Sequence, residues 1–115
     1  MTLHFDLDSD RLGQRSRAAL DRVAAILEDR AELAVAIDGH ADESGSEEHN
    51  QTLSERRAQK VAEYLGERGV EAARLTVHAF GELEPLDPEH ERQRDRRNRR
   101  VEVRFASQNA TGDTE

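Results

Sequence analysis

The sequence IDGHADESGSEEHNQTLSERRAQKVAEY, residues 37–64, decides the fold. An apolar alternation ends at Gly39, which is typical of a strand that stops there. A short polar loop follows and carries His40 and Asp42, and a helix with Arg57 in its first turns comes next. A strand that delivers an acid to a loop, beside a helix that delivers an arginine, is suited to binding a small molecule that carries both charges.

Length and composition set limits on the function. With 115 residues, the chain is long enough to bury a core as one domain. The formal net charge of −8 argues against general binding to nucleic acid or to an anionic membrane, because both need a positive field. The chain has no cysteine, no signal segment and no apolar run of the roughly 20 residues that span a bilayer. We therefore expect a cytoplasmic protein or, in preference, a domain of a longer protein.

The spacing of apolar residues predicts two helices and four strands. The expected helices are Arg15–Asp29 and Glu48–Arg68, and the expected strands are Thr2–Leu7, Leu33–Asp38, Leu75–Ala79 and Val101–Phe105. The first two strands, joined by a helix, favour a parallel pair, and Gly69 is placed to end the second helix in a left-handed conformation. The order β-α-β-α-β-β indicates the α/β class, an α+β sandwich with two helices packed on one face of a mixed four-stranded sheet.

Two segments lack periodicity. Residues 81–97 hold two prolines and many charges, so they are expected to form a loop, and its length suggests a functional or mobile segment. The polar segment Ser107–Glu115 is expected to be disordered. The folded domain is then residues 1–106, followed by a disordered tail at 107–115.

Five spaced elements resemble one protein family. They are Phe5–Leu12 (FDLDSDRL), Gly39–Asp42 (GHAD) followed by Gly45, the helix positions Asn50, Leu53, Ser54, Arg57 and Ala58, the segment Phe80–Glu82 with Pro85, and Asn98–Val101 (NRRV). The second and third elements are similar to the family pattern GH[TA]D-x-x-G…N-x-x-L-S-x-x-R-A. On these residues the chain is identified as a member of the OmpA-like C-terminal domain family, which binds peptidoglycan.

The resemblance implies a non-catalytic domain in the periplasm that holds the diaminopimelate of the stem peptide and anchors an envelope protein to the cell wall. Diaminopimelate ends in an ammonium and a carboxylate on one carbon, so it calls for an acid and an arginine close together. Asp42 and Arg57 stand at the matching positions, and Asn50, Arg99 and Asp8 are further candidates. We expect neither Asp42 nor Arg57 to belong to the apolar core.

Each candidate also has a purely structural explanation. Asp42 and Asp8 could form turns, and Asn50 could lie on a helix surface. Arg57 could be solvated, but it shares the sheet-facing side of its helix with the apolar stripe, so it needs a partner. Arg99 shares strand parity with the apolar residues of the last strand, which points it to the covered side and favours a role in the site.

Two other functions stay open. The same fold could serve as a protein–protein adaptor in a secretion or motility complex. A hydrolase or metal site built from His40, Asp42 and His78 has poor support, because no second ligand stands at i+4 and no serine or cysteine stands beside a base. We therefore expect no enzyme activity, cofactor or metal. The expected partner is peptidoglycan, with other envelope proteins as further candidates and no nucleic acid or direct membrane contact.

Overall fold

The computed structural model describes residues 1–6, 9–40, 47–81 and 99–107. Its strands are β1 (Thr2–His4), β2 (Leu33–His40), β3 (Leu75–Gly81) and β4 (Arg100–Ser107), and its helices are α1 (Gln14–Asp29), α2 (Glu47–Glu67) and the short 3-10 helix η1 (Ala72–Arg74). The expected order of two helices and four strands is confirmed. Neither of the long helices described has an apolar stretch that could cross a membrane.

The four strands form one mixed sheet in the order β1-β4-β2-β3. β4 pairs antiparallel with both β1 and β2, whereas β2 pairs parallel with β3. The first two strands run parallel to each other, as expected, because each is antiparallel to β4; the expectation that they pair directly is wrong, since β4 lies between them. The apolar alternation of β4 explains this position. Val101 lies opposite Leu3 of β1, and Val103 lies opposite Ile37 of β2, so β4 contributes apolar side chains next to both neighbouring strands.

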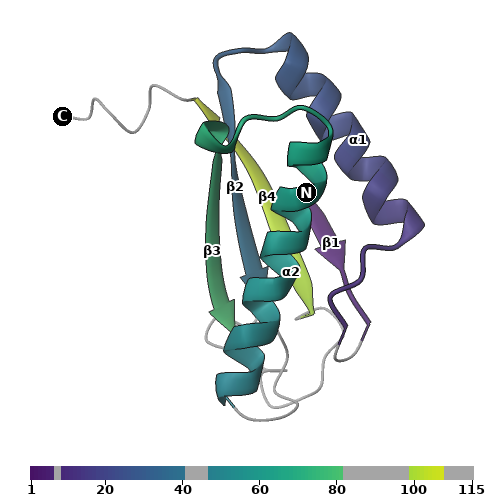
Figure 1. Cartoon of the computed structure of the whole chain (residues 1–115), viewed down its shortest axis with the longest axis vertical. Coiled ribbons are helices and arrows are strands. Elements are labelled where there is room, and N and C mark those ends of the chain that lie inside the picture. The colour runs from purple at the N-terminus through teal and green to yellow at the C-terminus, as the bar shows by residue number, and fades with distance from the viewer. Residues whose placement is uncertain (7–8, 41–46, 82–98, 108–115) are drawn as a thin grey trace, which may run out of the picture.

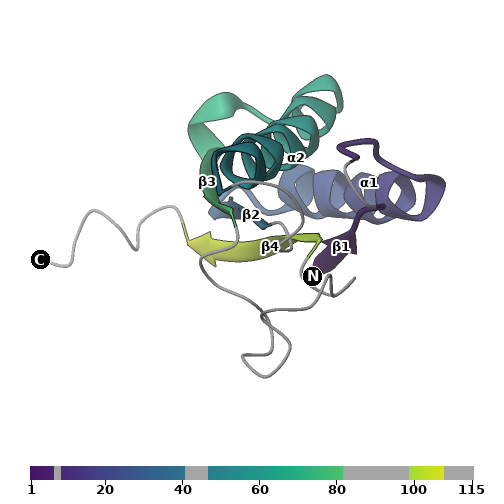
Figure 2. The same cartoon turned by 90° about the horizontal axis from the view of Figure 1, so that it is seen from below.

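Both long helices cover the same face of the sheet, as predicted (Figures 1 and 2). The core between the layers is made of small and medium aliphatic side chains. Its most buried members are Leu20, Val23 and Leu27 of α1, Val35 and Ile37 of β2, Ala58, Val61 and Leu65 of α2, and Val101 and Val103 of β4. The helical spacing of the α1 and α2 members places each set on one stripe.

Gly69 ends α2 as expected. Its φ of 97° lies in the left-handed region, which glycine adopts without a steric penalty. The N–H of Gly69 donates to the carbonyl of Gly66 at 3.0 Å, and the N–H of Val70 donates to the carbonyl of Leu65 at 3.1 Å. This pair of bonds is a Schellman motif, and it turns the chain back toward η1 and β3.

The strand boundaries differ from the prediction at both ends of the sheet. β1 ends at His4, although the N–H of Phe5 still donates to the carbonyl of Arg99 at 2.8 Å. β2 continues two residues further than expected, to His40. Ser107, expected in the tail, is the last residue of β4. The predicted loop from residue 82 onward and the rest of the predicted tail lie outside the described residues.

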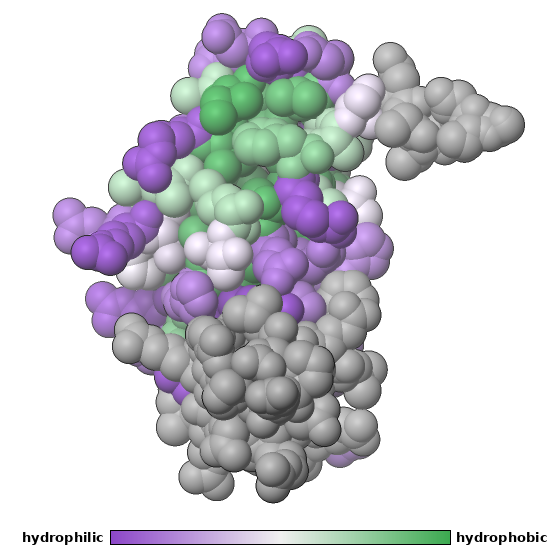
Figure 3. Space-filling model, turned by 180° about the vertical axis from the view of Figure 1, so that it is seen from behind, coloured by the Kyte–Doolittle hydropathy of each residue, from purple (hydrophilic) through white to green (hydrophobic). Residues whose placement is uncertain are grey.

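The face of the sheet away from the helices is hydrophobic toward one end and hydrophilic further along (Figure 3). Asp38 of β2 accepts hydrogen bonds from Nη2 and Nε of Arg104 at 2.6 and 3.1 Å. The Nδ1 atom of His78 lies 3.3 Å from the other carboxylate oxygen of Asp38. These contacts link β4, β2 and β3 across the sheet.

Candidate functional site

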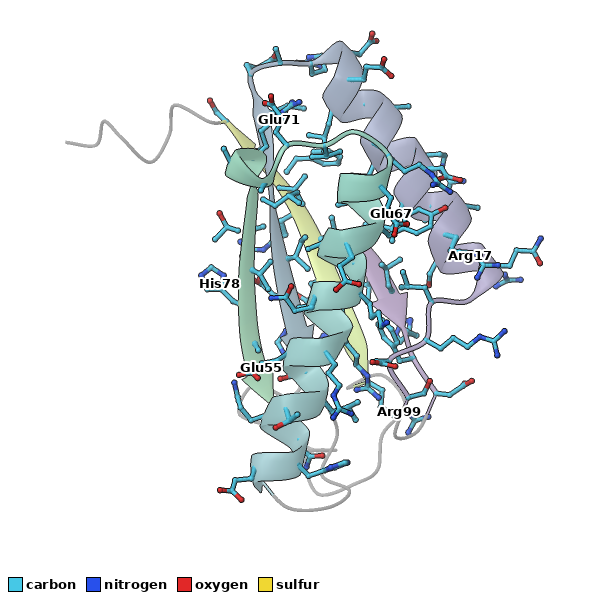
Figure 4. All side chains as sticks on the ribbon, in the orientation of Figure 1. Arg17, Glu55, Glu67, Glu71, His78 and Arg99 are labelled. Atoms are coloured by element: carbon cyan, nitrogen blue, oxygen red, sulfur yellow. The ribbon has the colours of Figure 1, made fainter. Side chains whose placement is uncertain are left out.

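The last residues of β1 and β2, the start of α2 and the start of β4 meet at one end of the domain, the lower end in Figure 1. Three of the predicted site residues, Asn50, Arg57 and Arg99, belong to this end. Figure 4 shows Arg99 there, below the sheet. The other two candidates, Asp8 and Asp42, lie outside the described residues. The structure therefore brings the two arginines and the asparagine of the prediction to one place.

Gly39 sets the distance between β2 and α2 at this end. A Cβ atom on Gly39 would overlap the backbone carbonyl oxygen of Ser54 and approach the Cβ of Ala58 to 3.1 Å. Only glycine tolerates such a close approach between a strand and a helix. The first turns of α2 therefore rest directly on the last residues of β2.

The inner stripe of α2 changes character along the helix. Its first half presents Asn50, Ser54 and Arg57, which are 1%, 0% and 0% exposed, beside the apolar Leu53, and its second half presents Val61 and Leu65. The polar half lies at the end of the sheet, and the apolar half covers the sheet's centre. Buried polar side chains are stable only with hydrogen-bond partners, so the polar half indicates a specific set of contacts.

Arg57 joins three segments of the chain at this end. Its Nε donates to the carbonyl of Ser9 at 2.8 Å, and its Nη1 donates to the carbonyl of His40 at 3.0 Å. Its Nη2 donates to the carbonyl of Asp6 at 3.1 Å. The guanidinium carbon lies 5.2 Å from the centre of the Phe5 ring, within the range of a cation–π contact.

The expectation that Arg57 stays outside the core is therefore wrong. Among the described residues it is the largest fully buried side chain. The physical reason is the planar guanidinium, whose fixed fork of donors can meet three carbonyls that converge from two separate parts of the chain. Arg57 is a structural residue at this site, whatever it binds in addition.

Arg99 holds the same part of the chain from the other side. It is half-buried, and its Nε donates to the carbonyl of Phe5 at 3.1 Å. Arg57 donates to the carbonyl of the next residue, Asp6. Two arginines, one in α2 and one just before β4, thus position the chain that leaves β1.

The two histidines of the enzyme alternative have different surroundings. His40 is 3% exposed, and burial, followed by the positive charge of Arg100, lowers its pKa from 6.5 to about 4. The ring is therefore neutral at neutral pH. His78 is half-exposed beside Asp38. Within the part of the chain that the structure describes, no group of three or more His, Cys, Asp or Glu is placed to hold a metal ion, and the absence of metal and of catalysis stays a prediction.

The partners of Arg57 could not be found by residue type. The carbonyls of Asp6, Ser9 and His40 are backbone groups, which every residue possesses, and they belong to residues far from Arg57 in the sequence. The one sign of these contacts in the sequence was the position of an arginine among the apolar residues on the sheet-facing side of the predicted helix.

Comparison with known proteins settles the family. A family model described as OmpA family matches residues 4–99. The chain belongs to the OmpA family. This OmpA-family domain is 38% identical over 103 residues to the peptidoglycan-associated lipoprotein of Pseudomonas aeruginosa, a match that covers 90% of this chain and 61% of that protein. It is 40% identical over 104 residues to the outer-membrane lipoprotein YfiB of the same organism, covering 86% of this chain and 59% of YfiB.

A solved structure agrees with this assignment. The peptidoglycan-associated lipoprotein from Burkholderia pseudomallei superposes with a TM-score of 0.84 at 28% identity, covering 91% of this chain and 89% of that chain. The two-helix, four-stranded architecture is thus the one found in OmpA-like proteins. The OmpA-family domain spans about three fifths of the length of the two curated relatives.

Proposed function

We propose that this OmpA-family domain binds peptidoglycan without cleaving it, through the diaminopimelate of the stem peptide, and so anchors an envelope protein to the wall. Relatives named for their association with peptidoglycan support cell-wall anchoring at the level of the family. Diaminopimelate is the finer part of the proposal, and it rests on residues of this chain. The proposed location is the periplasm, and the proposed binding unit is residues 1–106.

The observation that carries the proposal is the fixed guanidinium of Arg57. The backbone carbonyls of Asp6, Ser9 and His40 hold its plane and position. Because the side chain is already ordered, a ligand carboxylate that pairs with it loses little side-chain entropy. The buried surroundings also strengthen a charge-assisted hydrogen bond.

The zwitterion at the end of diaminopimelate gives the other residues their proposed roles. Its carboxylate pairs with Arg57, and its ammonium pairs with Asp42. Asn50, buried two turns before Arg57 on the same face of α2, can bond the peptide. Arg99, which is half-buried, and Asp8 are proposed to border the ligand. No step in this account requires a metal, a cofactor or a nucleophile.

Pull-down with purified sacculi tests the proposal. Asp42→Ala and Asn50→Ala should weaken binding, Asp42→Ala by roughly thirtyfold or more, because removing one partner of a charged contact typically costs ~2–5 kcal/mol. Arg56→Ala is the control, since Arg56 is exposed on the same helix. Circular dichroism establishes that each variant is folded. Normal binding by folded Asp42→Ala would contradict the proposed site, and muropeptide release from sacculi that His40→Ala abolishes would contradict the non-catalytic function.

A further inference from the structure

The outer side of β3 is an edge of the sheet. Within the described residues β3 pairs with β2 alone, and it is seven residues long. Figures 1 and 2 show it at this edge, with α2 along its inner side. An edge strand presents a row of backbone N–H and C=O groups with which a further strand can pair. β3 is therefore long enough to accept an added strand.

An apolar hollow of about 310 Å³ lies beside this edge, between α2 and β3. Two side chains of β3 that pack against the core, Leu75 and Val77, stay partly exposed here. The apolar layer between helix and sheet is thus open along β3. The apolar lining comes from both elements and from their connection: Ala62, Gly66, Val70, Ala72, Leu75 and Val77. We call the β3 edge together with this hollow the α2–β3 groove.

The rim of the α2–β3 groove is acidic. Glu63 lines the hollow, and Glu55 stands two turns before it on the same side of α2. Glu71 lies in the connection between α2 and η1. Figure 4 shows Glu55 and Glu71 toward opposite ends of β3. All three glutamates are exposed, and in the part of the chain that the structure describes none of them forms an ion pair.

Positive charges are directed away from the groove. The described residues that line the hollow include no arginine or lysine. Arg68 forms an ion pair with α1 at 2.9 Å, and the guanidinium of Arg74 donates to three backbone carbonyls within residues 27–33. Arg56 and Lys60 line a neighbouring hollow on α2 that does not include β3. The groove therefore offers a negative field that is complementary to a basic segment.

We propose that the α2–β3 groove binds an extended, basic and apolar segment of a partner protein, which adds a strand to β3. Backbone hydrogen bonds to β3 would hold the segment, and the hollow would take one of its apolar side chains. A second copy of this chain is disfavoured, because its own glutamates would meet like charges. The groove includes none of the residues proposed to bind the stem peptide, so the proposal does not rest on peptidoglycan binding.

The geometry of the two elements defines the pattern of the segment. Glu55 and Glu63 are separated by two turns, about 12 Å along the axis of α2. In an extended strand, side chains four positions apart lie on one face, about 13 Å from each other. We therefore expect two lysines or arginines four positions apart, with an apolar residue midway between them that enters the hollow.

Selection from a phage library of random short peptides on the parent domain tests the proposal. The selected peptides should carry this pattern, and the one selected most often, made synthetically, is the probe. In an NMR titration it should shift the amide resonances of β3 saturably and slow the hydrogen exchange of β3 amides. Failure to select any peptide, selected peptides without the paired basic residues, or shifts confined to other segments would overturn the proposal.

Charge reversal tests the acidic rim. Glu63→Lys and Glu55→Lys should each weaken binding of the probe peptide by about fivefold, the upper range for an exposed ion pair. Glu28→Lys is the control, because Glu28 is exposed on α1 and its replacement changes the net charge by the same amount. Its affinity should equal that of the parent. Equal affinities of Glu63→Lys and the parent would contradict the role of the rim.

Gly66→Leu distinguishes loss of the groove from loss of the fold. Gly66 lines the hollow, and a Cβ added there meets no atom within 4 Å. A leucine should fill the hollow and weaken binding of the probe peptide by about tenfold, the value of burying one apolar side chain. The melting temperature should not fall, because glycine is unfavourable inside a helix. Undiminished binding by Gly66→Leu would contradict the proposed place of the peptide.

Sedimentation of the parent alone tests the choice of a partner protein over a second copy. The parent should be monomeric at the concentrations that bind the probe peptide. A dimer that both Glu63→Lys and Gly66→Leu dissociate would assign the groove to a second copy of this chain and overturn the proposal.

Discussion

Replacing Arg57 by alanine should destabilise the domain strongly, in contrast to the expectation from sequence that this residue lies outside the core. The substitution removes a fully buried side chain from the contact between α2 and the ends of β1 and β2. It leaves the carbonyls of Asp6, Ser9 and His40 without the donor that they share. It also removes the cation–π contact with the Phe5 ring.

The size of the effect follows from these contacts. A hydrogen bond with a charged donor stabilises by about 1.5–3 kcal/mol, so three such bonds give roughly 4.5–9 kcal/mol. Part of this loss is offset, because the variant no longer buries a charge. We therefore expect the loss of stability that typically follows the breaking of a buried charged contact, about 3–5 kcal/mol. At about 4 °C or more per kcal/mol, the melting temperature should fall by at least about 12 °C.

Thermal unfolding followed by circular dichroism, with urea unfolding as a second measure, gives the result. Arg56→Ala is the matched control, because Arg56 is exposed on the next position of the same helix and should change stability by no more than about 0.5 kcal/mol. Arg57→Lys should recover only part of the loss, since an ammonium cannot reach three carbonyls in a plane. A melting temperature of Arg57→Ala within about 4 °C of the parent would refute this role.

Three further predictions concern the fold around the site. Gly39→Ala should lower the melting temperature clearly, while Gly66→Ala, whose Cβ meets nothing within 4 Å, should not; equal melting temperatures would contradict the close approach. Because the pKa of His40 is about 4 in the folded state and 6.5 when unfolded, stability should fall as the pH drops from about 6.5 to 4, and urea unfolding of His40→Gln should show a shallower fall in that window. Deleting residues 108–115 should leave the melting temperature within about 4 °C of the parent, and a larger drop would indicate a docked tail.

The sequence predicts the elements well, because each depends on local spacing. The apolar stripes of α1 and α2 and the alternation of β2 and β4 are visible within short windows, and Gly69 marks the end of α2. The neighbours of a strand depend on the whole chain. Nothing near β1 shows that β4, about a hundred residues later, pairs with it instead of β2.

The candidate site was likewise predicted only in part. Asn50, Arg57 and Arg99 were candidates because of the family resemblance and of their positions on the predicted helix and strand, and the structure brings all three to one end of the domain. The structural role of Arg57 could not be predicted, because its acceptors are backbone carbonyls from other segments. Gly39 was recognised as the end of a strand, whereas its contact with the Ser54 carbonyl requires the packed helix.

The measurement that tests the central claim most directly is calorimetric titration of the parent domain with two stem peptides. One contains diaminopimelate, and the other contains lysine, which keeps the ammonium but lacks the second carboxylate. The diaminopimelate peptide should bind at least about thirtyfold more tightly, because the lysine peptide leaves the fixed guanidinium of Arg57 without its anion. Equal affinity for the two peptides would contradict the assignment of Arg57 to the ligand carboxylate.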